Sequence, residues 1–212
     1  MSWLQQNWTS VFPLAGAHVL LAGIPLVVGL LLAIPLGWAA RSWGRAYPVI
    51  VTTSGLLYTI PSLALFILMP LILGTRILDP VNVVAAMTVY TVALLVRTVA
   101  DGIGAVPDHV QQSATAMGYG RFRRFLTIEL PLAVPVIVAG LRVAAVSNVS
   151  IVSVASLVGV SQLGDLLIDG YRRNIPAELW LGIGATLLLA LVFDVVITAA
   201  GRAFTPWTRV QA

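Results

Sequence analysis

The sequence contains neither cysteine nor lysine. Without cysteine, the chain can form no disulfide bond, no thiolate metal site and no cysteine nucleophile. Without lysine, it lacks the side chain that holds nucleotide phosphates in a Walker A loop, and all twelve cationic side chains are arginine. If ATP powers this protein, another chain must therefore hydrolyse it.

Charged residues are scarce, and hydrophobic residues are abundant. Charged side chains make up 9% of the 212 residues and hydrophobic ones 59%, whereas soluble domains carry about 25% charged residues. The start of the chain also lacks the cationic region that precedes the apolar core of a cleavable signal peptide. The composition predicts an all-α membrane protein.

Patterns typical of enzymes and metal sites are missing too. His18 and His109 lie far apart, with no carboxylate at metal-ligand spacing, and no Gly-x-Ser-x-Gly motif of a serine hydrolase occurs. The arginines lie next to apolar stretches, which argues against nucleic-acid binding. We expect no catalytic residue, no metal ion, no cofactor and no nucleic-acid partner for this chain.

The apolar stretches predict five membrane-spanning helices of roughly 20 residues each. They form one transmembrane domain over residues 1–212, with spans near residues 18–40, 48–73, 81–99, 132–158 and 179–200. With the N-terminus outside and the C-terminus in the cytoplasm, eight arginines, Arg209 among them, fall on the cytoplasmic side and three fall outside. This orientation follows the positive-inside rule.

Residues 111–135 form the longest stretch that does not look like a membrane span. A polar half rich in small residues is followed by Arg121, Arg123 and Arg124. We predict a short amphipathic helix over residues 108–126. The side chains expected to share its apolar flank are Ala114, Met117, Phe122, Phe125 and Leu126. Such a basic segment lies at the cytoplasmic surface, where it faces lipid head groups or a partner protein.

This stretch resembles the coupling motif of permease subunits in binding-protein-dependent ABC importers, Glu-Ala-Ala-x3-Gly-x9-Ile-x-Leu-Pro. The motif positions met here are Ala114, Gly118, Ile128, Leu130 and Pro131. Gln112 and Ser113 replace the Glu and the first Ala of the motif. In that family the motif helix inserts into a groove of an ATP-binding subunit, and Gly118 would allow close backbone approach. The coupling positions that the resemblance implies are Ala114, Gly118, Tyr119, Gly120, Arg121, Arg123 and Arg124.

Other segments narrow the resemblance to osmoprotectant permeases: residues 58–65, 129–142 and 162–167 are similar to theirs. The resemblance implies a type I ABC importer permease in the bacterial cytoplasmic (inner) membrane, for glycine betaine, carnitine or choline. It also implies three partners: an ATP-binding subunit that holds ATP and magnesium, a second permease subunit, identical or paralogous, and a separate extracytoplasmic binding protein. A permease for another small zwitterion or amino acid, or a stand-alone secondary carrier, is the alternative.

Two ionisable residues fall inside predicted spans. Arg142 lies about 15 Å deep and Asp194 about 12 Å deep from the same side, at 1.5 Å per helical residue. Charges at such depth are costly and need partners. We predict that the two side chains pair, either as a static tie between the last two spans or as a pivot that repacks during transport.

Candidate residues for a translocation path or hinge come from two spans. Ser147, Asn148 and Ser150 belong to a stripe of polar residues in the fourth span, although small residues there also permit close helix packing. Pro61 and Ser62 mark a kink in the second span, which is either a gate hinge or a static bend. The polar loop at residues 159–176 offers candidate contacts for the binding protein: Gln162, Asp165, Asp169, Arg172 and Arg173.

Overall fold

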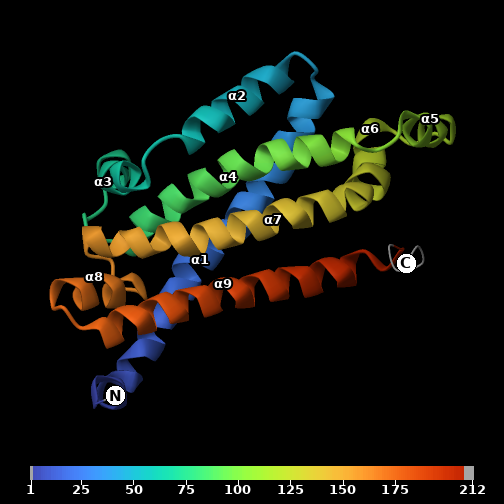
Figure 1. Cartoon of the computed structure of the whole chain (residues 1–212). Coiled ribbons are helices and arrows are strands. Elements are labelled where there is room, and N and C mark those ends of the chain that lie inside the picture. Colours follow the sequence, from blue (N-terminus) through green and yellow to red (C-terminus); the bar gives the residue numbers. More distant parts are fainter. Residues whose placement is uncertain (1, 208–212) are drawn as a thin grey trace.

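The computed structural model describes residues 2–207, and their side chains from residue 9 onward. All regular secondary structure in this part of the chain is helical. The long helices are α1 (Ser2–Ser42), α4 (Pro80–Gly104), α7 (Leu130–Val152) and α9 (Pro176–Phe204). In Figure 1, α4, α7 and α9 run nearly alongside one another, and α1 crosses them obliquely. The predicted all-α class is confirmed.

Shorter helical segments join the long helices. They are α2 (Ala46–Tyr58), α3 (Ser62–Leu73), α5 (Asp108–Ala116), α6 (Arg121–Arg124), a π-helical segment (Phe125–Glu129), a 3₁₀ segment (Ser153–Val158) and α8 (Gly164–Arg172). In Figure 1, α3 and α8 lie at one end of the bundle, and α5 and α6 lie at the other. The N-terminal end of the chain is near α8, and α9 ends on the side of α5 and α6.

The second predicted span is not one kinked helix. Here α2 and α3 meet at an angle of 103°. Pro61 has no N–H to continue the helical ladder, and its extended backbone (φ −60°, ψ 130°) starts α3 in a new direction. Four helical stretches in the described residues are long and apolar enough to cross a membrane, and the α2–α3 pair makes a fifth only if it counts as one broken span.

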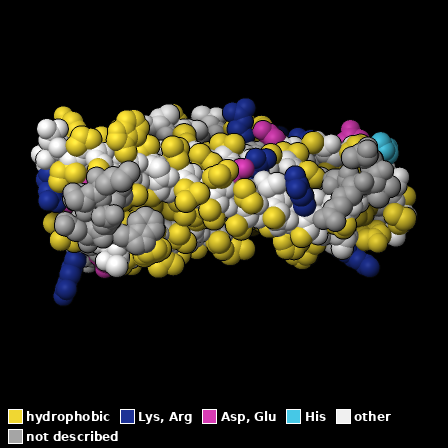
Figure 2. Space-filling view, turned by 60° about the horizontal axis from the view of Figure 1, so that its bottom comes forward, with side chains coloured by type: hydrophobic (Ala, Val, Ile, Leu, Met, Phe, Trp, Pro, Cys, Tyr) yellow, Lys and Arg dark blue, Asp and Glu magenta, His cyan; other side chains and the backbone are white. Residues whose placement is uncertain are grey.

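Small residues let the long helices pack closely. An ideal Cβ on Gly29 of α1 would lie 2.4 Å from Thr91 of α4, and one on Gly140 of α7 would lie 2.4 Å from Thr98 of α4. The backbones of α1 and α7 therefore approach α4 from two sides. The rest of the surface is largely apolar, as Figure 2 shows for one face, because a membrane helix turns hydrophobic side chains outward as well as inward.

Candidate functional site

The predicted coupling segment is two helices joined by a tight turn. Helix α5 ends at Ala116, and Gly118 adopts a left-handed conformation with φ +82°. The Tyr119 N–H then donates to the Ala114 carbonyl at 3.1 Å, which closes the end of the helix. A single helix over residues 108–126 was therefore a wrong prediction. A Cβ on Gly118 would meet no other atom of this chain within 4 Å, so the turn, not crowding by this chain, calls for glycine here.

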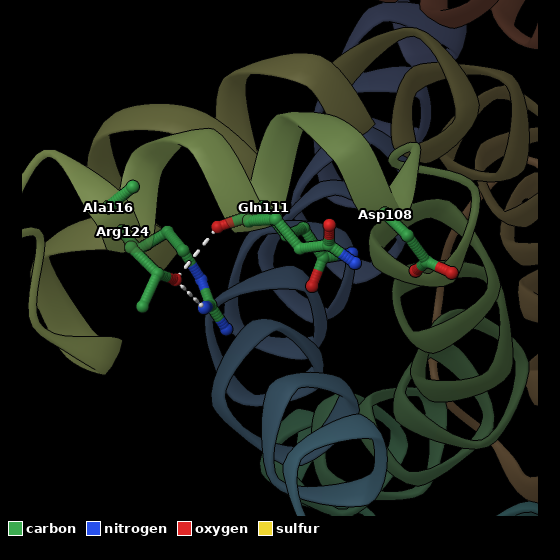
Figure 3. A pocket seen from close by; sticks show the side chains of 6 residues that line it. Asp108, Gln111, Ala116 and Arg124 are labelled. Carbon is green, nitrogen blue, oxygen red and sulfur yellow. Dashed lines mark hydrogen bonds between the residues drawn. The ribbon is translucent and has the colours of Figure 1, made fainter.

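One face of α5 forms a hollow of about 520 Å³. It is lined by Asp108, Gln111, Gln112, Thr115, Ala116 and Arg124. Figure 3 shows Asp108, Gln111 and Ala116 along this helix, with Arg124 reaching toward it from α6. Apart from Arg124, these side chains did not appear among the expected coupling residues, although a spacing of three to four residues puts them on one face of a helix.

The structure separates the expected coupling residues into two groups. Gly118, Gly120, Arg121 and Arg123 are exposed, and the Arg123 guanidinium lies 4.8 Å from the centre of the half-buried Tyr119 ring. Ala114, in contrast, is 1% exposed and faces its own chain. Its expected role as a contact for a partner is therefore corrected: the side chain is buried by its own chain.

The expected apolar flank of this segment is also incomplete. Ala114 and Phe125 are buried, but Met117, Phe122 and Leu126 are exposed. The turn at Gly118 changes the direction of the chain, so side chains before and after it no longer follow one helical period.

Arg124 connects the two helices of this segment to α7. Its Nη1 donates to Thr115 Oγ1 of α5 at 2.8 Å, and its Nε donates to Glu129 Oε1 at 2.6 Å. Glu129 is buried and closes the π-helical segment, in which the Leu130 N–H reaches back five residues to the Phe125 carbonyl. A buried carboxylate needs a paired cation, and Arg124 provides it. This side chain is therefore an internal link, whereas the sequence placed it at the rim of a contact.

The expected contact between Arg142 and Asp194 is present. Arg142 Nε lies 2.6 Å from Asp194 Oδ1 and Nη2 lies 2.9 Å from Oδ2, which is the bidentate geometry that guanidinium and carboxylate groups favour. The pair joins α7 to α9. The two side chains keep 45% and 28% of their exposure in the isolated chain, so the pair lies at the surface of the bundle and not in its core.

The break between α2 and α3 is held by a side chain of α4. The Tyr90 hydroxyl donates to the Ile60 carbonyl, and the Tyr90 ring meets the Tyr58 ring edge to face at a centroid distance of 5.8 Å. Pro61 at the break is exposed, and Ser62 is half-buried. The sequence located the bend at Pro61 but gave no sign that Tyr90, thirty residues away, anchors it.

Of the three polar residues expected along a path in α7, Asn148 is in the core. Its Nδ2 donates to Thr91 Oγ1 at 2.9 Å and to the Ala22 carbonyl at 3.3 Å. Asn148 thus joins α7 to α4 and α1, and its expected place on a translocation path is corrected. Ser147 is half-buried and Ser150 is exposed.

Gln162 is likewise buried, at 0% exposure, so it cannot contact a binding protein as expected. Its Oε1 lies 2.8 Å from His18 Nδ1 and accepts from the Gly164 N–H at 2.6 Å. His18 Nε2 lies 2.9 Å from the Val149 carbonyl. These bonds tie α1 to the junction between α7 and α8, a role that the sequence did not indicate for His18.

The remaining outer residues are more accessible. Asp169, Arg172 and Arg173 are exposed, and Asp165 is half-buried. Close by, Glu178 is buried, and its Oε2 has no hydrogen-bond partner among the described residues.

Comparison with known proteins decides the family. The family described as binding-protein-dependent transport system inner membrane component matches residues 25–210. The chain belongs to this family. The match covers every candidate residue discussed above except His18.

Curated relatives of this permease are similar over most of their length. It is 27% identical over 206 residues to the glycine betaine/carnitine/choline transport system permease protein OpuCB of Bacillus subtilis, with 97% of this chain and 94% of the relative covered. It is 32% identical over 201 residues to the osmoprotectant import permease protein OsmY of Salmonella typhimurium, with 95% and 78% covered.

The fold of the permease is similar to that of a solved ABC transporter. A chain of the MetNI methionine ABC transporter, in an inward-facing conformation, matches with a TM-score of 0.81 and covers 92% of this chain and 96% of its own length. The two sequences are 16% identical, so this likeness concerns the fold alone. By its family, the chain is a permease of the ABC-transporter kind, which is a transport subunit.

Proposed function

We propose that this permease is the membrane subunit of an importer for small osmoprotectants such as glycine betaine, carnitine or choline. A separate subunit supplies the energy by hydrolysing ATP. The names of the two relatives support the solute class. The observation that carries the energy coupling is the exposed turn at Gly118 beyond α5, which projects from one end of the bundle (Figure 1) at the spacing of the coupling motif.

The proposed assembly has four kinds of component. The ATP-binding subunit holds ATP and magnesium and docks on the α5 hollow and the Gly118 turn. A second permease subunit, identical or paralogous, completes the route. An extracytoplasmic binding protein docks near Asp169, Arg172 and Arg173, which are exposed at the opposite end of the bundle. The arginine distribution supports an N-terminus outside and a C-terminus in the cytoplasm of a bacterium, with the permease as a multi-pass protein of its inner membrane.

In the proposed mechanism, closure of the ATP-binding subunits moves α5. Arg124 carries this movement onward, because it bonds both to Thr115 on α5 and to Glu129 at the start of α7. The Arg142–Asp194 pair then links α7 to α9. Both helices rock together, and the route changes from inward-open to outward-open.

The exposed ion pair supports a second permease subunit. Charged groups in a membrane face a bundle interior or a water-filled cavity, because lipid solvates them poorly. The described residues leave 45% of the Arg142 side chain exposed. We place the second subunit, or the route between the two subunits, over this face.

Solute uptake tests the proposal directly. The chain is expressed with its ATP-binding subunit and binding protein in a bacterial host that lacks osmoprotectant uptake, and entry of labelled glycine betaine, carnitine and choline is measured. A matched strain carries an ATP-binding subunit without its Walker A lysine. We expect uptake of at least one of these solutes in the first strain and none in the second. Equal uptake in both strains would point to a stand-alone carrier, and competition by amino acids alone would show that the solute class is wrong.

A further inference from the structure

A second hollow lies where α1, α4, α5 and α6 meet. Its volume is about 260 Å³. The lining residues are Trp38, Arg41, Ser42, Ile103, Gln111, Arg121, Arg124 and Glu129. Three arginines and one carboxylate therefore surround a space that no side chain of the described protein fills.

The positive charge in this hollow is only partly neutralised. Glu129 pairs with Arg124. Arg41 has no hydrogen bond or ion pair with the described residues, and Arg121 donates only to the Ser42 carbonyl, at 3.3 Å. Neither guanidinium is paired with a carboxylate in the part of the chain that the structure describes. The site therefore has two guanidinium groups available for an anion.

The backbone is built to admit one of these guanidinium groups. An ideal Cβ on Gly104 would lie 3.1 Å from Arg41 Nε and 3.2 Å from its Cζ. Because Gly104 has no side chain, Arg41 can lie flat against the last turn of α4 and keep its outer N–H groups free. Planar guanidinium groups of this kind bind phosphate oxygens through parallel hydrogen bonds.

Three aromatic rings, of which only that of Phe122 is exposed, lie beside the charges. Trp38 stacks on Phe125 at a centroid distance of 5.0 Å and meets the edge of Phe122 at 5.9 Å. Phe122 is itself 61% exposed. Tryptophan is enriched at the level of lipid head groups, where an amphipathic ring meets both apolar and polar surroundings. Cationic and apolar groups side by side fit an amphiphile better than a free anion.

We propose that this hollow binds the phosphate group of an anionic phospholipid, with an acyl chain beside Phe122. The lipid belongs to the leaflet on the side of α5 and α6. The inference rests on the proposed function in naming that leaflet cytoplasmic and in naming the partner that the adjoining segment contacts. Basic pockets between helices on this side of a membrane are suited to such head groups. The bound lipid joins the end of α1 to α6 and so steadies the segment that contacts the ATP-binding subunit.

Native mass spectrometry of the assembled transporter measures the bound lipid. The protein is purified with phosphatidylglycerol as the anionic probe and phosphatidylcholine as the zwitterionic one. We expect retention of phosphatidylglycerol, with affinity about fivefold lower in Arg41→Gln and in Arg121→Gln. Arg123→Gln is the matched control: it removes the same charge from the same surface, but Arg123 lies over Tyr119 and does not line the hollow.

Three results would overturn the proposal. The first is equal retention of phosphatidylglycerol by all four proteins. The second is that inorganic phosphate occupies the hollow and no lipid is retained, which would make the ligand a free anion. The third is loss of the ATP-binding subunit from Arg41→Gln with lipid retention intact, which would assign the hollow to a protein partner. Arg41 has no bond with the described residues, so its removal should leave folding unchanged. Uptake is measured separately. Transport without lipid binding would contradict this inference alone, and lipid binding without transport would contradict the proposed function alone.

Discussion

Replacing Gly118 with alanine isolates the contribution of the turn between α5 and α6. The glycine has φ +82°, and a Cβ there would meet no atom of this chain within 4 Å. The added methyl group therefore clashes with nothing inside the subunit. What it changes is the free energy of the left-handed backbone conformation.

The size of that change follows from backbone sterics. For an ordinary L-residue, the left-handed conformation costs about 1–2 kcal/mol relative to the right-handed one. The population of the native turn should therefore fall about 5- to 30-fold relative to alternative conformations. Asparagine tolerates this conformation better than alanine, so Gly118→Asn should reduce the population of the native turn less than Gly118→Ala does. Gly120 has φ −65°, which any residue adopts, so Gly120→Ala should carry no cost from a left-handed backbone.

The assay is ATP hydrolysis by the reconstituted transporter, with and without loaded binding protein. We expect stimulation to fall in the order wild type and Gly120→Ala, then Gly118→Asn, then Gly118→Ala. Co-purification of the ATP-binding subunit with each variant checks that assembly is intact.

The comparison also separates two roles for Gly118. If the glycine is needed for close approach to the partner subunit, stimulation of ATP hydrolysis must be lower with the larger asparagine than with alanine. If the turn conformation is what matters, stimulation must be higher with asparagine. Equal stimulation in Gly118→Ala and Gly120→Ala would refute the argument from backbone conformation.

Three further predictions concern the helices. Asp194→Asn should lower the folded yield in membranes several-fold because it leaves Arg142 unpaired, and the double exchange Arg142→Asp with Asp194→Arg should restore part of that yield. Fluorescence-detected chromatography measures the yield. No recovery in the double variant would count against a simple pair. Tyr90→Phe should lower the free energy of unfolding by about 1 kcal/mol, because the Ile60 carbonyl loses its hydrogen-bond donor, and a lower thermal midpoint would show this. Asn148→Ala should cost about 1–3 kcal/mol by leaving buried polar groups without partners; an unchanged midpoint would show that they find other partners.

Much of the fold follows from local sequence. Long apolar runs predict long helices because a helix satisfies its backbone hydrogen bonds within one segment, as the interior of a membrane requires. Pro61 predicts a bend because its ring removes a donor. The pairing of Arg142 with Asp194 follows from their similar depth in the predicted spans, because a charge inside a span needs a partner. What such reasoning cannot supply is the size of the bend, 103°, because tertiary contacts such as the hydrogen bond from Tyr90 of α4 to the Ile60 carbonyl are not visible in the local sequence.

Two of the errors share a physical cause. The roles of Gln162 and Asn148 depend on partners more than fifty residues away, His18 for the one and Thr91 for the other. A polar residue in an apolar span can line a translocation route or form hydrogen bonds with a neighbouring helix, and the sequence alone fits both roles. The break in the coupling segment was missed for a different reason: glycine has low helix propensity, but whether it adopts φ above zero depends on the backbone bonds that close the turn.

The π-helical segment between α6 and α7 has a consequence for rotational phase. A π-helical turn inserts one extra residue into an otherwise α-helical course. The wide turn absorbs this residue, so α6 and α7 keep nearly the rotational phase that a continuous α-helix would give them. Deleting one residue within Phe125–Glu129 should therefore leave Arg121 and Arg124 near Ser42 and Thr115, and should change mainly the backbone between Arg124 and Glu129. The chain thus carries one additional residue at this point without rotating the cationic end of the helix away from its neighbours.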